Sequence, residues 1–231
     1  MSSNIIFILE CIGTVAFAIT GVLVAVSSNL DLFGVCFIGC ITAVGGGIMR
    51  DLVLGITPPL VFDNIVMILL ALIVSIAVFV LLYIKRDIYH QKDKIEHINN
   101  VFDAIGLGVF SIMGAETACA HGFQDNLLLV TVSGALTGIG GGMLRDICTK
   151  NIPSVLRKHV YAVASLVGIL VFYFTKRYIE HLAISSATAV LIVVVIRLLA
   201  AKYRWSLPKV NIGSESCNPK ESKEADGKDA S

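Results

Sequence analysis

The residues best suited to chemistry occur in two copies of one motif, Gly-Gly-Gly-x-x-Arg-Asp. In the first copy the glycines precede Arg50 and Asp51, and in the second copy they precede Arg145 and Asp146. The six glycines are Gly45, Gly46, Gly47, Gly140, Gly141 and Gly142. Both copies follow apolar stretches, where an ionisable side chain is costly unless it is paired or hydrated. The Arg-Asp pairs are therefore candidates for opening or closing a path through a membrane.

An interfacial position is the alternative explanation for the Arg-Asp pairs. A long arginine side chain at the end of a membrane helix can extend its charge to the headgroups, with the neighbouring carboxylate as a cap. Apolar residues flank the first pair on both sides, which disfavours this explanation there. Lys150 and Asn151 follow the second pair closely, so the interfacial explanation is stronger in the second copy.

The glycine triplets also need a reason, because each glycine in a helix costs about 1 kcal/mol relative to alanine. Small residues spaced four apart form a stripe on each helix, and such stripes let membrane helices approach closely. The two stripes are Gly39, Ala43 and Gly47, and Gly134, Gly138 and Gly142. A stripe accounts for only one glycine of each triplet. We therefore favour a triplet that breaks or kinks its helix beside a solute path, where freed carbonyls can coordinate a cation; packing can operate as well.

Glu10 and Asp103 are acids at matching positions of two other apolar stretches. Each lies near the expected start of its helix, where the helix dipole favours a carboxylate, so we expect both to act as caps. Attraction of cations at the two ends of a path is their alternative role.

Long apolar stretches must position these residues. The chain has 231 residues, of which 56% are hydrophobic and 15% are charged, whereas a soluble domain carries roughly 25% charged residues. Seven stretches approach the length of about 20 residues that a membrane helix needs. They cover residues 5–26, 32–53, 61–84, 101–119, 127–148, 159–175 and 182–201. We expect an all-α membrane protein with seven transmembrane helices.

The chain contains an internal repeat. Residues 41–51 align with residues 136–146, and Pro58 and Pro153 follow in the same register. Each unit holds three spans, an odd number, so the second unit must enter the membrane from the other side. We predict a first three-helix repeat over 1–88, an inverted second repeat over 99–178, a seventh helix over 179–205 and a disordered cytoplasmic tail over 206–231.

Lysine and arginine predict the orientation, because they concentrate in cytoplasmic loops of membrane proteins. They gather in the loops after the third and fifth spans and after the seventh span. The N-terminus is therefore expected outside and the C-terminus in the cytoplasm.

Other function classes find little support in the sequence. The net charge of +1 does not suggest a nucleic-acid partner, and the glycine runs lack the Lys-Ser/Thr of a phosphate-binding loop. We find no nucleophile-base combination and no cluster of metal ligands, so we expect no enzyme, no cofactor and no metal beyond permeant ions.

The doubled motif, the seven spans and the two prolines resemble the prokaryotic branch of the trimeric intracellular cation (TRIC) channel family. The same domain has been labelled a glycine transporter in bacteria. The resemblance covers residues 5–201 and implies a homotrimer in a bacterial inner membrane, with one pore in each protomer. It implies K⁺ and Na⁺ as permeant ions and a pore between the first, second, fourth and fifth helices, kinked at both triplets. A secondary transporter of a small solute such as glycine is the alternative, because an inverted repeat serves both functions.

Overall fold

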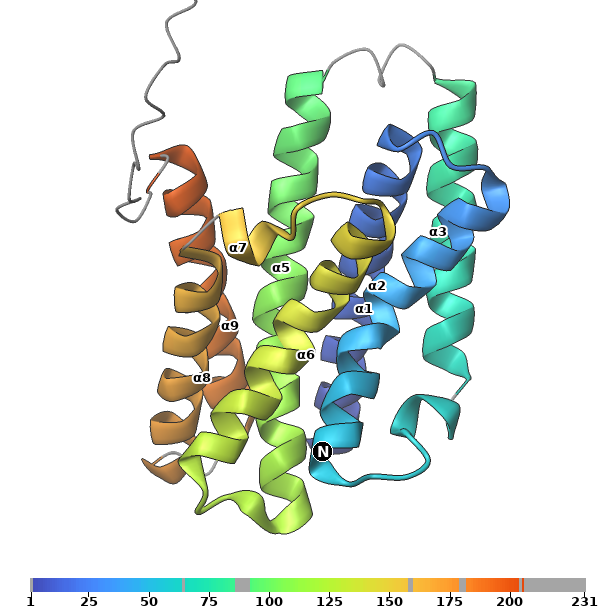
Figure 1. The fold of residues 1–231 in the computed structure, drawn as a ribbon. Coiled ribbons are helices and arrows are strands. Elements are labelled where there is room, and N and C mark those ends of the chain that lie inside the picture. The colour runs from blue at the N-terminus through green and yellow to red at the C-terminus, as the bar shows by residue number, and fades with distance from the viewer. Residues whose placement is uncertain are drawn as a thin grey trace, which may run out of the picture.

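The computed structural model describes residues 2–63, 65–85, 92–157, 160–178, 182–203 and 205, and the predicted tail over 206–231 lies outside these residues. The described part is a bundle of long helices (Figure 1), seven of which are long and apolar enough to cross a membrane. These are α1 (Ser2–Ser27), α2 (Leu32–Leu54), α3 (Val66–Ile84), α5 (Lys92–Ala118), α6 (Leu127–Cys148), α8 (Val160–Tyr178) and α9 (Leu182–Lys202). The predicted all-α membrane fold is confirmed.

Short helical segments connect some of these spans, and two predicted boundaries are wrong. The segments are η1 (Leu60–Phe62), the π-helical η2 (Cys119–Phe123) and α7 (Ser154–Arg157). The third span begins at Val66 rather than at residue 61, because Leu60–Phe62 form a separate 3₁₀ turn after Pro59. The fourth span begins at Lys92 rather than at residue 101, because the polar residues up to Asn100 continue the helix beyond its apolar stretch.

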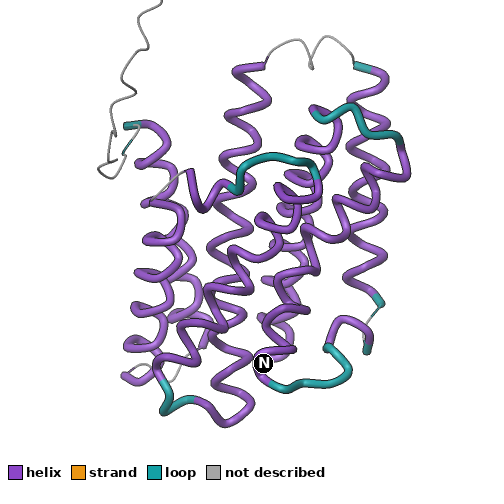
Figure 2. The backbone as a smooth tube through the Cα atoms, in the orientation of Figure 1, coloured by secondary structure: helices purple, strands orange, loops and turns teal. Residues whose placement is uncertain are grey.

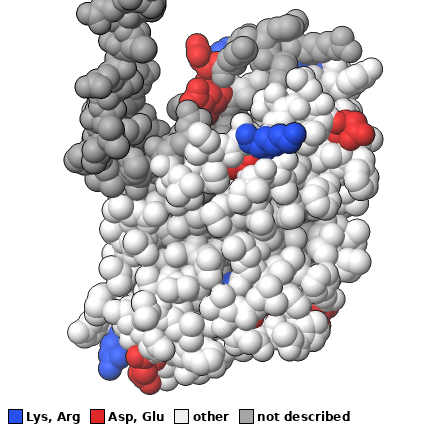
Figure 3. Space-filling view, viewed as in Figure 1, with Lys and Arg blue, Asp and Glu red and all other residues white. Residues whose placement is uncertain are grey.

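The outer surface of the bundle is apolar along its length. Large hydrophobic side chains such as Phe33, Ile73 and Leu191 are exposed on it. The face drawn in Figure 3 is mostly uncharged, with charged side chains gathered near its two ends. This distribution is the one expected of helices in contact with lipid or with other membrane-embedded chains.

The first three spans match the next three in order, α1 with α5, α2 with α6 and α3 with α8. In Figure 1 α1 rises from the end where the N-terminus lies, whereas α5 runs down toward that same end. The connections between helices gather at the two ends of the bundle (Figure 2). The boundaries predicted for the repeats fall partly outside the described residues and stay predictions.

The ends of α2 and α6 repeat the same capping chemistry. The Asp31 side chain accepts a hydrogen bond from the Gly34 N–H at the start of α2, and Asn126 accepts one from Leu129 N–H at the start of α6. Each helix is followed by a residue in the left-handed region, Gly55 (φ 71°) after α2 and Lys150 (φ 58°) after α6. Side-chain caps of this kind satisfy backbone groups that a helix end leaves free.

α2 and α6 lie against each other at the centre of the bundle, and they cross at the middle glycine of each triplet. A Cβ atom on Gly46 would overlap the Thr137 carbonyl oxygen, and one on Gly141 would overlap the Thr42 carbonyl oxygen. The two contacts are reciprocal, as expected from the repeat. Only a residue without a side chain lets the backbones meet here.

The structure corrects the expectation that the triplets break their helices. α2 and α6 continue as α-helices through all six glycines, so no backbone groups are released there; a bend of the helix axis stays a prediction. The adjacent glycines face different neighbours instead. A Cβ on Gly45 would contact Leu144, one on Gly46 would meet backbone, and Gly47 faces open space. Close contact with α6 therefore accounts for Gly45 and Gly46, whereas no close neighbour requires a glycine at Gly47.

Phe17 and Phe110 form a second reciprocal contact, between α1 and α5. Their ring centroids are 5.1 Å apart. The Phe17 ring lies where a Cβ on Gly106 would be, and the Phe110 ring lies 3.0 Å from where a Cβ on Gly13 would be. Each phenylalanine therefore fills a space that a glycine of the other half leaves.

The crossing can be tested by adding a single methyl group. Gly46→Ala is expected to destabilise the protein by about 1–3 kcal/mol, because the Cβ must push α6 away. Gly47→Ala is the matched control: its Cβ meets nothing closer than an Arg50 nitrogen at 3.8 Å, so a neutral effect or a gain of up to about 1 kcal/mol is expected. Thermal unfolding in detergent, followed by circular dichroism, measures both. Equal losses in the two variants would contradict the assigned crossing.

Candidate functional site

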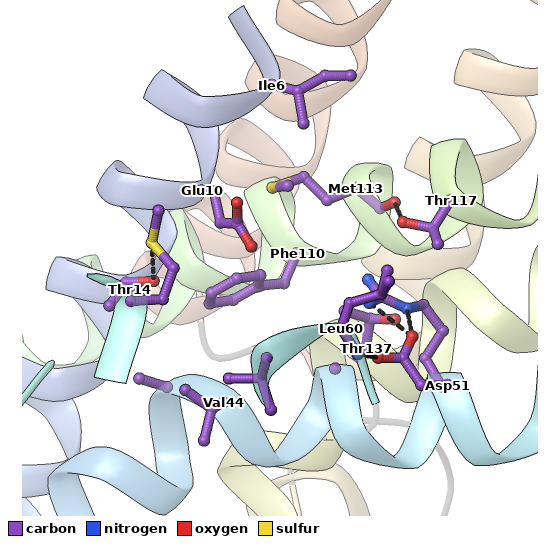
Figure 4. Close-up of a pocket in the computed structure, with 15 residues that line it drawn as sticks. Ile6, Glu10, Thr14, Val44, Asp51, Leu60, Phe110, Met113, Thr117 and Thr137 are labelled. Carbon is purple, nitrogen blue, oxygen red and sulfur yellow. Dashed lines mark hydrogen bonds and ion pairs between the residues drawn. The ribbon is translucent and has the colours of Figure 1, made fainter. Parts of the chain in front are cut away.

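A cavity of about 250 Å³ lies beside the end of α2 that carries Arg50 and Asp51. Its wall is formed by α1, α2, η1, the first turn of α3, α5 and α6, and we call it the first chamber. Figure 4 shows Glu10 on its α1 wall, Asp51 on its α2 wall and Phe110 on its α5 wall. The volume is far above the 10–15 Å³ or so that one water needs, so the chamber can hold water or a partly hydrated cation.

Arg50 and Asp51 form an ion pair between neighbours on α2. The Arg50 Nε donates to Asp51 Oδ1 at 2.8 Å, and Asp51 Oδ2 accepts a hydrogen bond from the Leu60 N–H at 2.9 Å. Asp51 therefore neutralises the arginine and also fixes η1 against the end of α2. Both side chains are buried.

The second Arg-Asp pair repeats this geometry at the opposite end of the bundle. The Arg145 Nε donates to Asp146 Oδ1 at 2.8 Å, and Asp146 Oδ2 accepts a hydrogen bond from the Ser154 N–H at 2.7 Å. Ser154 begins α7, which follows α6 as η1 follows α2. The motif thus has a local function in both halves: its aspartate pairs with the arginine and ties down the next segment.

Asp103 of α5 connects the second pair to the seventh span. Its Oδ1 lies 3.3 Å from the Arg145 Nη1, and its Oδ2 lies 3.3 Å from the Arg197 Nη2 of α9. The Arg197 guanidinium also lies over the Tyr161 ring, 4.5 Å from its centroid. All of these side chains are buried. We call the group of Asp103, Arg145, Asp146, Tyr161 and Arg197 the second cluster.

Glu10 and Asp103 therefore occupy matching positions with different surroundings. Asp103 bridges two arginines. Glu10 forms no ion pair within 4 Å with any described residue, and the half-buried Glu10 side chain borders the first chamber. The chamber groups Glu10, Arg50 and Asp51 give a formal charge of −1. Such a carboxylate beside water can attract a cation and hold it weakly.

Two expectations from the sequence are wrong. Glu10 and Asp103 do not cap helices, because α1 begins at Ser2 and α5 at Lys92, so both acids lie more than a turn inside. The interfacial explanation for the Arg-Asp pairs also fails. Arg145 is 1% exposed and Arg50 is 8% exposed, so their charges are held inside the protein and do not extend to headgroups.

Arg197 and Tyr161 belong to the site, but the sequence comparison of the two halves did not single them out. Arg197 lies in the seventh span, which has no counterpart in the repeat. The signal that was available is its charge: Arg197 is the one ionisable residue within the apolar stretch 182–201, and such residues in membrane spans usually mark a functional site. Tyr161 offered no comparable signal.

No group of three or more His, Cys, Asp or Glu side chains among the described residues is arranged to hold a metal ion. The first chamber instead has carboxylate and hydroxyl oxygens on its wall, which are hard ligands of the kind that alkali cations accept. The first chamber includes the hydroxyl-bearing side chains of Thr14, Thr117 and Thr137.

Comparison with known proteins gives two matches to one family model. The model described as glycine transporter matches residues 7–83 and again residues 100–177, one match in each half. A UPF0126 membrane protein of Vibrio cholerae is 36% identical over 217 residues, which is 90% of this chain and 84% of the relative. The UPF0126 inner membrane protein YadS of Escherichia coli K12 is 32% identical over 203 residues, covering 88% and 94%.

Solved structures are similar over nearly the whole bundle. A prokaryotic TRIC channel crystallised in 0.5 M KCl has a TM-score of 0.80 and 37% identity, covering 89% of this chain and 100% of that one. The TRIC orthologue from Rhodobacter sphaeroides has a TM-score of 0.78 and 28% identity, covering 87% and 100%.

The seven apolar helices and the inner-membrane relatives identify a multi-pass inner-membrane protein, and its family and fold are those of membrane channels and transporters. Within that class, the chain belongs to the TRIC cation channel family. The family expected from the doubled motif is therefore confirmed.

The two Arg-Asp pairs differ in access to water, and this difference predicts unequal mutant stabilities. Arg145→Gln leaves the buried Asp146 without its cation, and breaking a buried pair costs about 3–5 kcal/mol. Arg50→Gln leaves Asp51 beside a cavity that water can fill, so its loss should be smaller. Thermal unfolding midpoints of both variants in one detergent measure the difference. A larger loss for Arg50→Gln would contradict the assignment of the second cluster as the drier site.

Proposed function

We propose that the protein is a passive monovalent cation channel, permeable to K⁺ and Na⁺, with one pore in each protomer. The observation that carries the proposal is the first chamber: α1, α2, α5 and α6 contribute most of its wall, and it has a formal charge of −1. A negative chamber with low-dielectric walls concentrates cations and excludes anions. The similarity to solved TRIC cation channels supports this function.

The proposed pore runs from the first chamber, past the Phe17–Phe110 contact and the crossing of α2 and α6, to the second cluster. The two polar ends lie near the ends of α2 and α6, which Figure 1 places at opposite ends of the bundle. The crossing and the buried second cluster narrow this route, so conduction requires that both rearrange. Whether the triplets bend during that change belongs to the proposal.

The assembly and orientation are also proposed. A homotrimer is supported by the similarity to the trimeric intracellular cation channel orthologue of R. sphaeroides. We place the N-terminus outside and the C-terminus in the cytoplasm, because Lys and Arg gather in the loops at the end of the bundle where α9 ends. The first chamber then opens toward the outside.

A secondary transporter of a small solute such as glycine is the second candidate, favoured by the family model that matches both halves. A zwitterion needs a free cation for its carboxylate and a free carboxylate for its ammonium. Glu10 offers a free carboxylate for the ammonium group. The chamber's guanidinium, that of Arg50, is already paired with Asp51 at 2.7 Å and is not free for the carboxylate. The chamber therefore suits a simple cation better than an amino acid.

Single-channel recording separates the two functions. Purified protein in planar bilayers is expected to give discrete K⁺ and Na⁺ currents that saturate little with concentration, and the same protein in liposomes should not give saturable [¹⁴C]glycine uptake or counterflow. Saturable glycine flux without discrete currents would overturn the channel proposal and support the transporter.

Glu10→Gln tests the first chamber as the source of cation attraction. Removing its charge is expected to lower the unitary K⁺ conductance at low salt by about twofold or more, and the effect should fade at high salt as screening replaces the lost attraction. Asp125→Asn is the control, because it removes an exposed charge at the same end of the bundle outside the chamber. Equal effects of the two changes would mean that the chamber charge is not what attracts the ion.

A further inference from the structure

The seventh span places a cation in the second half that the first half lacks. α9 packs against α5 and α8, and among the described residues no helix takes the equivalent place beside α1 and α3. Its Arg197 reaches Asp103 and lies over the Tyr161 ring. The extra positive charge of the second site therefore comes from this helix, whereas Tyr161, beneath the guanidinium, belongs to α8.

The glycines that end the triplets show that the two sites also differ in open space. Gly47 faces the open first chamber, and a Cβ there would find only an Arg50 nitrogen at 3.8 Å. A Cβ on the matching Gly142 would lie 3.3 Å from the Tyr161 hydroxyl and 3.9 Å from Asp103 Oδ1. The space that is a cavity in the first half is therefore filled with side chains in the second half.

The charges of the two sites differ by the same residue. Glu10, Arg50 and Asp51 give the first chamber a formal charge of −1. Asp103, Arg145 and Asp146 would give the second site the same charge, and Arg197 brings it to zero. A bound monovalent cation would neutralise the second site in the same way, so Arg197 has the charge of such an ion.

The fit of Arg197 is loose for a buried ion pair. Its closest oxygen, Asp103 Oδ2, is 3.3 Å away, whereas charge-assisted N–H···O bonds are about 2.7–2.9 Å long. Its Nε and the Tyr161 hydroxyl have no hydrogen-bond partner among the described residues, although both are buried. Unsatisfied buried groups are costly, so this arrangement is one that a better-coordinated ion with water can replace.

We infer that the second cluster is a cation-binding chamber equivalent to the first, and that the Arg197 guanidinium occupies it as a tethered cation which a permeant K⁺ or Na⁺ must displace. The inference rests on the proposed channel function and adds a second cation site and its intramolecular occupant. Displacement moves Arg197 away from Asp103, after which Asp103 offers a carboxylate oxygen to the ion as Glu10 does in the first chamber. Arg145 remains paired with Asp146 throughout.

Arg197→Gln tests this inference in the full-length channel. The open probability is expected to rise about tenfold or more in symmetric KCl, because the competing cation is gone. The variant should also gain thermal stabilisation by KCl relative to choline chloride at equal ionic strength, since K⁺ can now bind the vacated site. Lys202→Gln is the matched control: it removes an exposed positive charge near the same end of α9 and should leave both measurements at the wild-type level.

Two further variants separate charge from packing. Arg197→Lys keeps a cation in the chamber and should keep the low open probability even if the glutamine variant folds poorly. Asp103→Asn combined with Arg197→Gln should abolish the KCl-specific stabilisation, because the carboxylate that binds the ion is lost. If Arg197→Lys opens the channel as strongly as Arg197→Gln, or if the double variant keeps the KCl response, the tethered-cation inference is overturned.

The two readouts keep this inference distinct from the channel proposal. If the wild type and all variants fail to conduct, the channel proposal fails, and the KCl-specific stabilisation of Arg197→Gln still decides whether the chamber binds a cation. If the wild type conducts and Arg197→Gln changes neither readout, only the tethered-cation inference fails.

Discussion

The backbones of α2 and α6 meet at Gly46 and Gly141, and this contact sets how closely the two halves of the bundle can pack. Each position faces a carbonyl oxygen of the other helix, so no side chain fits between them. In a membrane, helices associate through close packing because lipid is as apolar as their side chains. The crossing joins the two halves at their centre and leaves the ends of α2 and α6 apart, where polar residues line the space between helices.

Buried charge is tolerated at those ends because the arginine of each motif is paired with the aspartate that follows it. A lone guanidinium in a membrane protein is strongly unfavourable, and a pair remains costly unless its other hydrogen-bonding groups are satisfied. Here the second oxygen of each aspartate accepts a backbone N–H of the segment that follows. The same residues thus neutralise a charge and end the helix in a defined turn, which explains why the two halves repeat the motif together with the proline after it.

The repeat makes the two halves equivalent, and α9 makes them different. With α9 against the second half, Arg197 neutralises a site whose counterpart beside Glu10 is a cavity with a formal charge of −1. In the proposed channel, this asymmetry would give the repeated framework one end that attracts cations and one end where Arg197 competes with them.

Sequence patterns predicted the seven spans, the internal repeat and the positions of the Arg-Asp pairs, because apolar length and motif spacing are local properties of the chain. They misplaced the roles of several residues, mostly because contacts between distant segments decide them. Gly45 and Gly46 were expected to kink α2 until α6 was found packed against them, and an interfacial Arg145 was an open alternative until Asp103 was found beside it. Glu10 was misplaced for a local reason, because α1 begins well before it. The pairing of Arg197 with Asp103 became visible in the folded bundle, because the local pattern of an apolar span does not reveal which helix packs beside it.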